Sequence, residues 1–480
     1  MIKWAIQQYH HKLVIVVALM LHIVGAPALY AQELQWKVFG HLHNGLRGFC
    51  AAPIGSGRVL VIGGFSEQRG FQNYRIRGSV TNSCEMIDVK SRRITSAPSM
   101  HSPHANASMV QRQDSNIIII SGLNTDSTST PICELYDRKK NEWRVLGSLL
   151  IARHTHSAAL LNDEEILVVG GRAKSNYAPA IAEAEIFNIR TGQSRFVSDF
   201  PDKLCGGVSV ESHVFFSQSP IFLSGGGEGH KSYRLSNMYY FNERSSSWVC
   251  LGTFPEAGGT VSVRQLFDGR LVVAGDEKKA ILSENNTNTN TNTNTNSGSS
   301  IYLENQRGFV RVGTMLKHRA PSSIEQWSAS ILLGIGGASD RQGAYNSTEW
   351  FDIQTHQSIE GPLMNDARSE HVSISFPTFD AQGTQRGVCL LAIGGIGAEG
   401  HSLSSVEILE TTNPQLLEVP NPEIASQRLK KLLTSPTVIA TLSGFILILI
   451  AGLLYLLYQV LIIRRQSKFS YQSNAVGGHK

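Results

Sequence analysis

A short aliphatic run that ends in glycine occurs seven times along this chain of 480 residues. The final glycines stand at positions 64, 122, 171, 226, 275, 337 and 395, and five of the seven runs end in a Gly-Gly doublet. A short apolar run closed by glycine is typical of a buried β-strand that ends in a sharp turn. Seven such strands at similar spacing predict a repeat fold, in which each unit buries its apolar surface against its neighbours.

A second pattern keeps a constant phase to the first. After each glycine comes a polar loop and then a four-residue strand fragment that closes on Asp, Asn or Glu, and Glu opens five of the seven fragments. A closing Asp or Asn favours a turn because its side chain bonds backbone amides two residues on. Tryptophan stands six residues after the closing residue in two units, at Trp143 and Trp248. The fragments are Glu85–Asp88, Glu134–Asp137, Glu185–Asn188, Tyr239–Asn242, Ile301–Glu304, Glu349–Asp352 and Glu407–Glu410.

A third pattern, Arg or His followed three residues later by His or Cys, precedes four of the glycine runs. The pairs are Arg47 and Cys50, His101 and His104, Arg153 and His156, and Arg368 and His371.

Together these patterns resemble the kelch repeat over about residues 35–420. Kelch repeats fold as four-stranded blades around a central axis. The resemblance therefore implies an all-β, seven-bladed kelch-type β-propeller in residues 32–422. Six blades are the alternative, because the fifth unit has Ala274-Gly275 in place of the doublet and Ile301 in place of the opening Glu.

The N-terminal end of the repeat region predicts how a ring closes. Trp36–Gly40 mirrors Trp143–Gly147, so we expect it to form an outermost strand that completes the last blade. The competing strand is Leu416–Val419, which Pro414 and Pro420 flank and weaken, since proline cannot donate a ladder hydrogen bond.

Two units carry insertions after the glycine run. In the first, residues 65–83 include Arg69, Tyr74 and Arg75, a basic and aromatic composition suited to contact with a partner. In the fifth, residues 285–300 consist of Asn, Thr, Ser and Gly. This tract is expected to be disordered, because it cannot bury enough apolar surface to offset the entropy of ordering.

Both ends of the chain carry targeting signals. Residues 1–31 combine basic residues, an apolar run and an Ala-rich end, which predicts a secretory signal sequence, with an uncleaved signal anchor as the alternative. Residues 437–463 contain no charge and are long enough to span a bilayer as a helix, with a buried core helix as the alternative. Arg464 and Arg465 follow directly, which favours a cytoplasmic tail at 464–480. We therefore expect an extracytoplasmic propeller, a stalk at 423–436 and a single-pass anchor in the cell membrane.

The kelch resemblance also implies a candidate binding face. In kelch propellers the loops between blades and the loops after the glycine strand share one side, where ligands usually bind. For each residue there, a hydrogen bond to a neighbouring blade is the alternative role. The candidate residues are Arg47, Arg69, Tyr74, Arg75, His104, Arg153, His156, Arg368 and His371.

No motif predicts a catalytic residue, a cofactor or a metal site. The Gly-x-Gly-x-x-Gly at 395–400 leads into another strand, whereas a dinucleotide site requires a helix there. The pairs His101/His104 and His154/His156 repeat with the unit, which favours structural roles. The net charge of +5 without a basic run argues against a nucleic-acid surface. The six cysteines lack a CxxC spacing, and their pairing stays open.

These features favour a membrane-anchored, extracytoplasmic kelch propeller that binds a protein or a glycan and is not an enzyme. Its expected partner is an extracellular or periplasmic protein or glycan. The alternative is a sugar-acting kelch enzyme that resembles sialic-acid mutarotases or galactose oxidase, although no motif carries the catalytic residues of either family over to this sequence.

Overall fold

The computed structural model describes most of the repeat region. The described residues are 34–67, 79–173, 179–201, 208–210, 221–223, 237–253, 257–277, 298–305, 308–319, 323–339, 343–413 and 417. They all belong to one compact unit, Tyr30–Val419, and the other unit, Met1–Leu29 with Pro420–Lys480, lies outside them. The described part of the chain contains strands and loops and no helix.

The described strands form seven four-stranded antiparallel sheets. We number the sheets in chain order, and within each sheet we give the strands from the innermost to the outermost. The first three sheets are β3(Cys50–Pro53), β4(Arg58–Ile62), β7(Cys84–Asp88) and β8(Arg93–Ala97); β9(Ser108–Gln111), β10(Ile117–Ile120), β11(Ile132–Asp137) and β12(Glu142–Ser148); and β13(Ser157–Leu160), β14(Glu165–Val169), β15(Glu185–Asn188) and β16(Ser194–Phe196). The fourth and fifth are β17(Val208–Val210), β18(Ile221–Leu223), β19(Asn237–Asn242) and β20(Ser247–Thr253); and β21(Ala257–Gln265), β22(Leu271–Glu277), β23(Ser300–Asn305) and β24(Gly308–Thr314). The sixth and seventh are β25(Ser323–Gln326), β26(Ile331–Ile335), β29(Thr348–Asp352) and β30(Gln357–Glu360); and β31(Val372–Phe379), β32(Gln385–Ile393), β33(Ser405–Thr411) and β1(Lys37–His41).

The aliphatic runs of the sequence are the second strands of these sheets. In β10, all four isoleucines of Ile117–Ile120 are buried, and β14 and β26 show similarly continuous burial. A strand with one solvated face alternates between apolar and polar residues, so a continuous buried run requires cover on both faces. Neighbouring sheets supply that cover, because the apolar clusters join residues of adjacent sheets.

The glycine doublets end these strands with a backbone turn that other residues adopt poorly. Gly394 and Gly395 have φ values of 54° and 95°, and a Cβ atom on Gly395 would lie 2.4 Å from the carbonyl oxygen of Ser369. Both the left-handed conformation and the close backbone contact require glycine.

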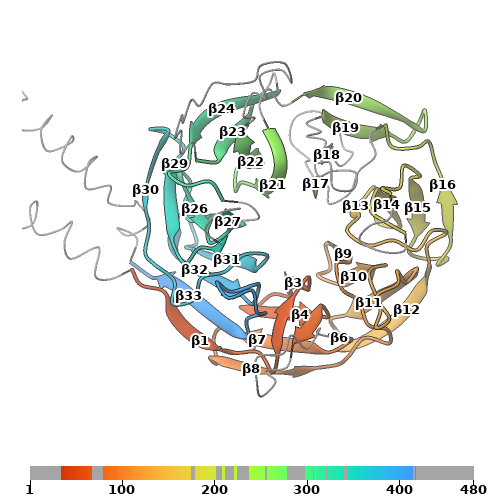
Figure 1. Ribbon diagram of the computed structural model, residues 1–480, viewed down its shortest axis with the longest axis horizontal. Helices are drawn as coiled ribbons and strands as arrows, with labels where there is room; N and C mark the ends of the chain where they lie inside the picture. The colour runs from red at the N-terminus through yellow and green to blue at the C-terminus, as the bar shows by residue number, and fades with distance from the viewer. Residues whose placement is uncertain are drawn as a thin grey trace, which may run out of the picture. The chain divides into compact units, whose positions relative to one another are not determined.

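The innermost strands contact one another in cyclic order. β3 contacts β9, the contacts continue through β13, β17, β21, β25 and β31, and β31 returns to β3 (Figure 1). Hydrogen bonds support some of these contacts, since Ser108 Oγ donates to the carbonyl oxygen of His156 in the next sheet at 2.6 Å. The sheets therefore form a closed, propeller-like ring.

The ring closes where the sequence predicts. β1 pairs with β33 in antiparallel register, with Lys37 opposite Ile408 and His41 opposite Ser405. The ladder skips one residue before Gly40, as the outer ladder of the second sheet does before Gly147. The expected pairing of the N-terminal segment with the last sheet is thus confirmed. Leu417, from the competing segment, lies outside any strand but is buried in the same apolar cluster.

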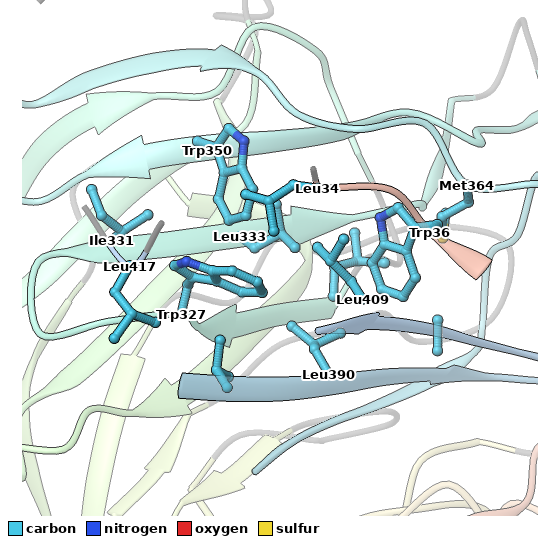
Figure 2. Packing of buried hydrophobic residues seen from close by; sticks show 13 residues of the cluster. Leu34, Trp36, Trp327, Ile331, Leu333, Trp350, Met364, Leu390, Leu409 and Leu417 are labelled. Atoms are coloured by element: carbon cyan, nitrogen blue, oxygen red, sulfur yellow. The ribbon is translucent and has the colours of Figure 1, made fainter. Parts of the chain in front are cut away.

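That cluster fastens the N-terminal segment between the sixth and seventh sheets. Leu34 and Trp36 pack with Trp350, Met364 and Leu409 (Figure 2), and all five are buried. The cluster contains atoms from the two ends of the described chain, so burial of apolar surface there depends on ring closure.

Among the described residues, the loops that enter the second, third and seventh sheets pair with the loops that follow the glycine strands of those sheets, and we call the face that they form the loop face. Isolated bridges join Ala105 to Leu123, His154 to Arg172 and Ser369 to Ile396. Two small sheets extend the same loops. They are β2(Gly45–Arg47), β5(Phe65–Glu67) and β6(Ser79–Val80), and β27(Ala338–Ser339) with β28(Gly343–Ala344).

Two expectations about the fifth unit differ from the structure. The tract 285–300 is expected to be disordered, yet Ser299 and Ser300 are buried, because Ser299 Oγ accepts a hydrogen bond from the Arg319 amide and Ser300 begins β23. Residues 285–297 lie outside the described residues. The outer bulge also shifts the strand fragment by one residue, to Tyr302–Asn305, since Tyr302 pairs just beyond the bulge as Glu134 does.

The predicted targeting segments cannot be compared with the structure. The signal sequence at 1–31, the stalk at 423–436, the span at 437–463 and the tail at 464–480 lie outside the described residues. Within the residues described, no helix is long and apolar enough to cross a bilayer.

Replacement of Trp36 by alanine should weaken ring closure. Loss of a buried tryptophan costs about 3–5 kcal/mol, so the unfolding midpoint of the full chain in urea should fall clearly. Lys37→Ala, an exposed position on the same strand, is the matched control and should change stability by less than about 0.5 kcal/mol. Equal midpoints for the two variants would contradict a closing role for Trp36.

Candidate functional site

A buried arginine ties the third sheet to the loop that enters it. Arg153 Nη1 donates to the carbonyl oxygens of Gly170 and Glu183 at 2.9 and 3.0 Å, and Nη2 lies 2.7 Å from Glu185 Oε1. Arg153 and Glu185 are both fully buried. A buried ion pair persists when further hydrogen bonds satisfy both partners, and this guanidinium is satisfied by backbone and carboxylate together.

The sixth and seventh sheets repeat this geometry. Arg319 Nε lies 2.7 Å from Glu349 Oε1, and Arg368 Nη2 lies 2.6 Å from Glu407 Oε1. The Nη1 atom of Arg368 donates to the carbonyl oxygen of Gly394, the first glycine of the doublet. The arginine therefore also holds the turn that ends the second strand.

Each paired glutamate binds the backbone of the incoming loop as well. Glu407 accepts the amides of Asn365 and Asp366 at 2.7 and 2.9 Å, and Glu185 accepts those of Leu150 and Ile151 at 2.7 and 3.3 Å. The glutamate at or near the start of the third strand is thus a junction between a sheet, its arginine and the loop from the preceding sheet.

In the second sheet a histidine replaces the arginine. His104 contacts the Ser121 carbonyl oxygen through Nδ1 at 2.6 Å and Glu134 Oε1 through Nε2 at 3.3 Å. Burial raises the pKa of Glu134, but hydrogen bonds from His104 and from the amides of His101 and Ser102 outweigh burial and hold that pKa below its usual value.

His104 therefore corresponds to Arg153 and Arg368, and the predicted three-residue phase is wrong in the first two units. The backbone confirms this register. The carbonyl oxygens of His104, Arg153 and Arg368 each accept a glycine amide of the preceding sheet, and in the first unit Leu46 occupies that place. The sequence pattern aligned His101 and Arg47 there, because their spacing to His104 and Cys50 resembled the Arg-x-x-His of the other units.

His156 and His371 occupy another equivalent position, just before the innermost strand. Both are buried, and neither ring nitrogen of either has a hydrogen-bond partner among the described residues. Phe49 and Ala107 occupy the same place in the first and second sheets, where each faces the glycine turn. Burial, and then the charge of Arg368, lowers the pKa of His371 to about 3, and burial lowers the pKa of His156 well below its usual value.

Arg47 is the only described candidate that is substantially exposed. Its guanidinium lies 5.0 Å from the ring centre of Phe65, and its Nε lies 3.6 Å from Glu67 Oε1. These residues belong to the small sheet β2–β5–β6 on the loop face. Arg69, Tyr74 and Arg75 lie outside the described residues.

The structure distributes the six described candidates around the ring and does not gather them. Five of these six are buried, three as hydrogen-bonded supports, the kind of role considered as the alternative, and two as packed imidazoles without a hydrogen bond. They are His104, Arg153, His156, Arg368 and His371.

A different polar cluster lies on three consecutive innermost strands. Arg264 Nη2 of β21 is 2.5 Å from Glu325 Oε2 of β25, and Ser373 Oγ of β31 donates to Glu325 Oε1 at 2.9 Å. The Glu325 side chain is 2% exposed, whereas that of Arg264 is 37% exposed. Since the carboxylate reaches both neighbouring sheets, it lies at the inner edge of its own sheet. Burial raises the pKa of Glu325, and attraction to Arg264 and hydrogen bonds from serines offset this only in part.

No sequence motif marks this cluster, because Arg264 and Glu325 are single residues far apart in the chain. The two charged residues can be recognised as unusual only once the ladder register of the sheets is known. The residues equivalent to Arg264 and Glu325 in the other five sheets are all apolar: Ala52, Val110, Ala159, Val210 and Ile374.

The cysteines and possible metal ligands offer no further cluster in the described part of the chain. Cys50, Cys84, Cys133 and Cys389 are free thiols, and burial raises the pKa of Cys50, Cys84 and Cys389 to about 12. No group of three or more His, Cys, Asp or Glu residues there is arranged to hold a metal ion.

No protein-family model matches the chain, and no curated protein matches it. A solved structure of a fungal alcohol oxidase of the AA5 family, in complex with copper, aligns with a TM-score of 0.53 and 13% identity, over 78% of this chain and 76% of that chain. The structure of YjhT aligns with a TM-score of 0.47 and 14% identity, over 68% of this chain and 100% of that chain. The chain has a kelch-like β-propeller fold. At such identities the likeness concerns the fold alone.

Loss of a junction arginine should destabilise the ring strongly. Arg368→Met leaves Glu407 buried without its cation, which costs about 3–5 kcal/mol. Arg195→Met is the control, because Arg195 and Glu165 form an exposed pair at 2.9 Å whose loss costs about 1 kcal/mol or less. Denaturant unfolding of both variants measures the difference, and a loss in Arg368→Met no greater than in the control would contradict the junction role.

His371 should make the ring sensitive to acid. Because its pKa is lowered to about 3 in the folded chain, the unfolded chain binds its proton first, and stability falls as pH drops from about 6.5 towards 3, by a few kcal/mol in all. His371→Phe, which copies Phe49, should flatten the unfolding midpoint over this pH range.

His41→Phe, at an exposed histidine, is the control for this measurement and should retain the acid sensitivity of the unaltered chain. An unchanged pH profile in His371→Phe would show that other groups cause the acid sensitivity.

Proposed function

We propose that this protein is a membrane-anchored, extracytoplasmic binding module with a seven-bladed kelch-type propeller, which recognises a protein or a glycan through its loop face. Each four-stranded sheet corresponds to one blade. Residues 437–463 form the single transmembrane helix, and residues 464–480 lie in the cytoplasm.

One observation carries the binding role: the chain adds structure to the loop face beyond what the ring requires. The small sheets β2–β5–β6 and β27–β28 stand outside the seven sheets, and both arise from loops that follow a glycine strand. The Ser402 amide donates to Glu67 Oε2 at 2.8 Å, which ties the first addition to the last sheet. Loops held by a rigid scaffold are where binding residues are usually found.

The chemistry of the first small sheet suits recognition. The Arg47 guanidinium lies beside both the Phe65 ring and the Glu67 carboxylate, so a cation, an aromatic ring and a carboxylate are exposed in part within one short sheet. Arginine and aromatic residues are enriched at binding hot spots. The buried junction arginines, in contrast, have no exposed surface with which to bind a partner.

A sugar-acting enzyme is the second candidate, and one observation favours it. Glu325 is a buried acid with a raised pKa beside Arg264, and acids of this kind are overrepresented in active sites. Conversion of a bound sugar, in place of its release unchanged, would favour this candidate over the binding module.

The binding role can be tested on cells that express the full chain with a tag on its C-terminal tail. Intact cells should capture a ligand from a panel of glycans and secreted proteins, and Arg47→Gln should weaken capture about tenfold. Protease added outside should remove the propeller and leave the tagged tail protected. Arg144→Gln, exposed on the outer strand β12, is the matched control and should bind normally.

Two results would contradict this proposal. One is a propeller that resists external protease until the cells are permeabilised, which would place it inside. The other is a ligand whose capture Arg47→Gln and Arg144→Gln leave equally unchanged, which would place binding away from the first small sheet.

A further inference from the structure

At one position of the innermost strands, two sheets have charged residues where the other five have apolar ones. At the same ladder position, five innermost strands have Ala, Val or Ile, and two neighbouring strands have Arg264 and Glu325. Ala52, Val110, Ala159 and Ile374 are buried in apolar clusters between sheets. The fold therefore accepts small and medium apolar side chains at this position.

Stability alone does not explain the charged pair. Replacement of a buried ion pair by apolar residues is often neutral or stabilising, and burial raises the pKa of Glu325, so its ionised form opposes folding at neutral pH. Groups that break a local rule without a structural gain are found mainly at functional sites. The junction pairs differ, because Arg153 and Arg368 also bind the carbonyl oxygens of the glycine turns.

The cluster can still reach a ligand. The Glu325 carboxylate is closed off on two sides by Arg264 and Ser373, but the Arg264 side chain is 37% exposed. A guanidinium has five N–H donors, and among the described residues Arg264 uses its side chain for one hydrogen bond, through Nη2 to Glu325. Donors therefore remain on the exposed part of Arg264, beside a carboxylate.

The charges restrict the class of ligand. An anion attracted to Arg264 meets Glu325 at the same place, and a cation attracted to Glu325 meets Arg264. A neutral molecule with adjacent hydroxyl groups suits the pair, because its oxygens accept from the exposed N–H groups of Arg264 and it carries no charge for either partner to repel. Hydrogen bonds to charged groups are the stronger kind, so few contacts give useful affinity.

We propose that Arg264, Glu325 and Ser373 form a binding site for a neutral, hydroxyl-rich ligand, a sugar or another polyol, on the innermost strands of the fifth, sixth and seventh sheets. Arg264 donates to the ligand hydroxyls, and Glu325, held in place by Ser373, fixes the guanidinium and offsets its charge. The site goes beyond the loop-face binding proposed above, and Arg47→Gln should leave it intact.

The test uses the full chain in a detergent without a sugar headgroup, such as lauryldimethylamine oxide. Glucose, galactose, mannose and myo-inositol are the neutral probes, with glucuronate and galacturonate as charged ones, and saturation-transfer NMR and calorimetry measure binding. At least one neutral probe should bind, and Arg264→Val and Glu325→Val, which copy Val110 and Val210, should each lower its affinity at least tenfold. The double variant Arg264→Val/Glu325→Val should unfold at the same temperature as the unaltered chain or above it, whereas Arg264→Val alone should unfold lower because it leaves Glu325 buried without its cation.

Conservative and distant variants complete the test. Glu325→Gln keeps the shape of the side chain and should also weaken binding, even if the valine variants fold poorly. Arg195→Met, at the exposed pair with Glu165, should bind like the unaltered chain. The proposal is overturned if the unaltered chain binds none of the neutral probes, if it binds only the uronates, or if Glu325→Gln binds as tightly as the unaltered chain.

Discussion

The buried glutamate at or near the start of the third strand of a sheet makes the contacts on which much of the ring depends. In Glu185, Glu349 and Glu407 the carboxylate accepts amides of the incoming loop and pairs with a buried arginine. The arginine in turn binds the glycine turn, so one interaction links two sheets, a loop and a turn. Because a carboxylate buried without its cation is costly, each junction selects one spacing between neighbouring sheets. In the second sheet Glu134 keeps the same role with His104 in place of arginine.

Much of this architecture could be predicted from the sequence because the sequence features that produce it recur in most of the seven units. Continuous aliphatic runs require cover on both faces, doublets such as Gly394-Gly395 require left-handed turns, and the Trp36 segment matches an outer strand elsewhere. The predicted strand fragment of the fifth unit differs from the structure. Its outer bulge shifts the fragment to Tyr302–Asn305, and ladder register of this kind depends on pairing between strands that a single sequence does not reveal.

The candidate site was harder to predict, for a physical reason. Arg153, Arg368 and His371 look like ligand-binding residues in a sequence, since buried supports and exposed binding groups use the same side chains. Only the structure shows that the first two are fully bonded to backbone and carboxylate, and that the third is enclosed without a hydrogen bond. In a repeat protein, polar residues that recur with the unit are therefore better candidates for its framework than for its ligand.

The converse gives the more informative rule. Every sheet of the ring packs against its neighbours in the same way. The residue types that five sheets have at an equivalent position therefore show which side chains the fold requires there. Arg264 and Glu325 fall where Ala52, Val110 and Ile374 suffice, and the partial exposure and unused donors of Arg264 are not required by the packing of the ring. Comparison among the sheets of this one chain thus distinguishes residues that depart from the repeat from residues that maintain the fold. This separation is the basis for the site proposed on the innermost strands, in addition to the binding proposed for the loops.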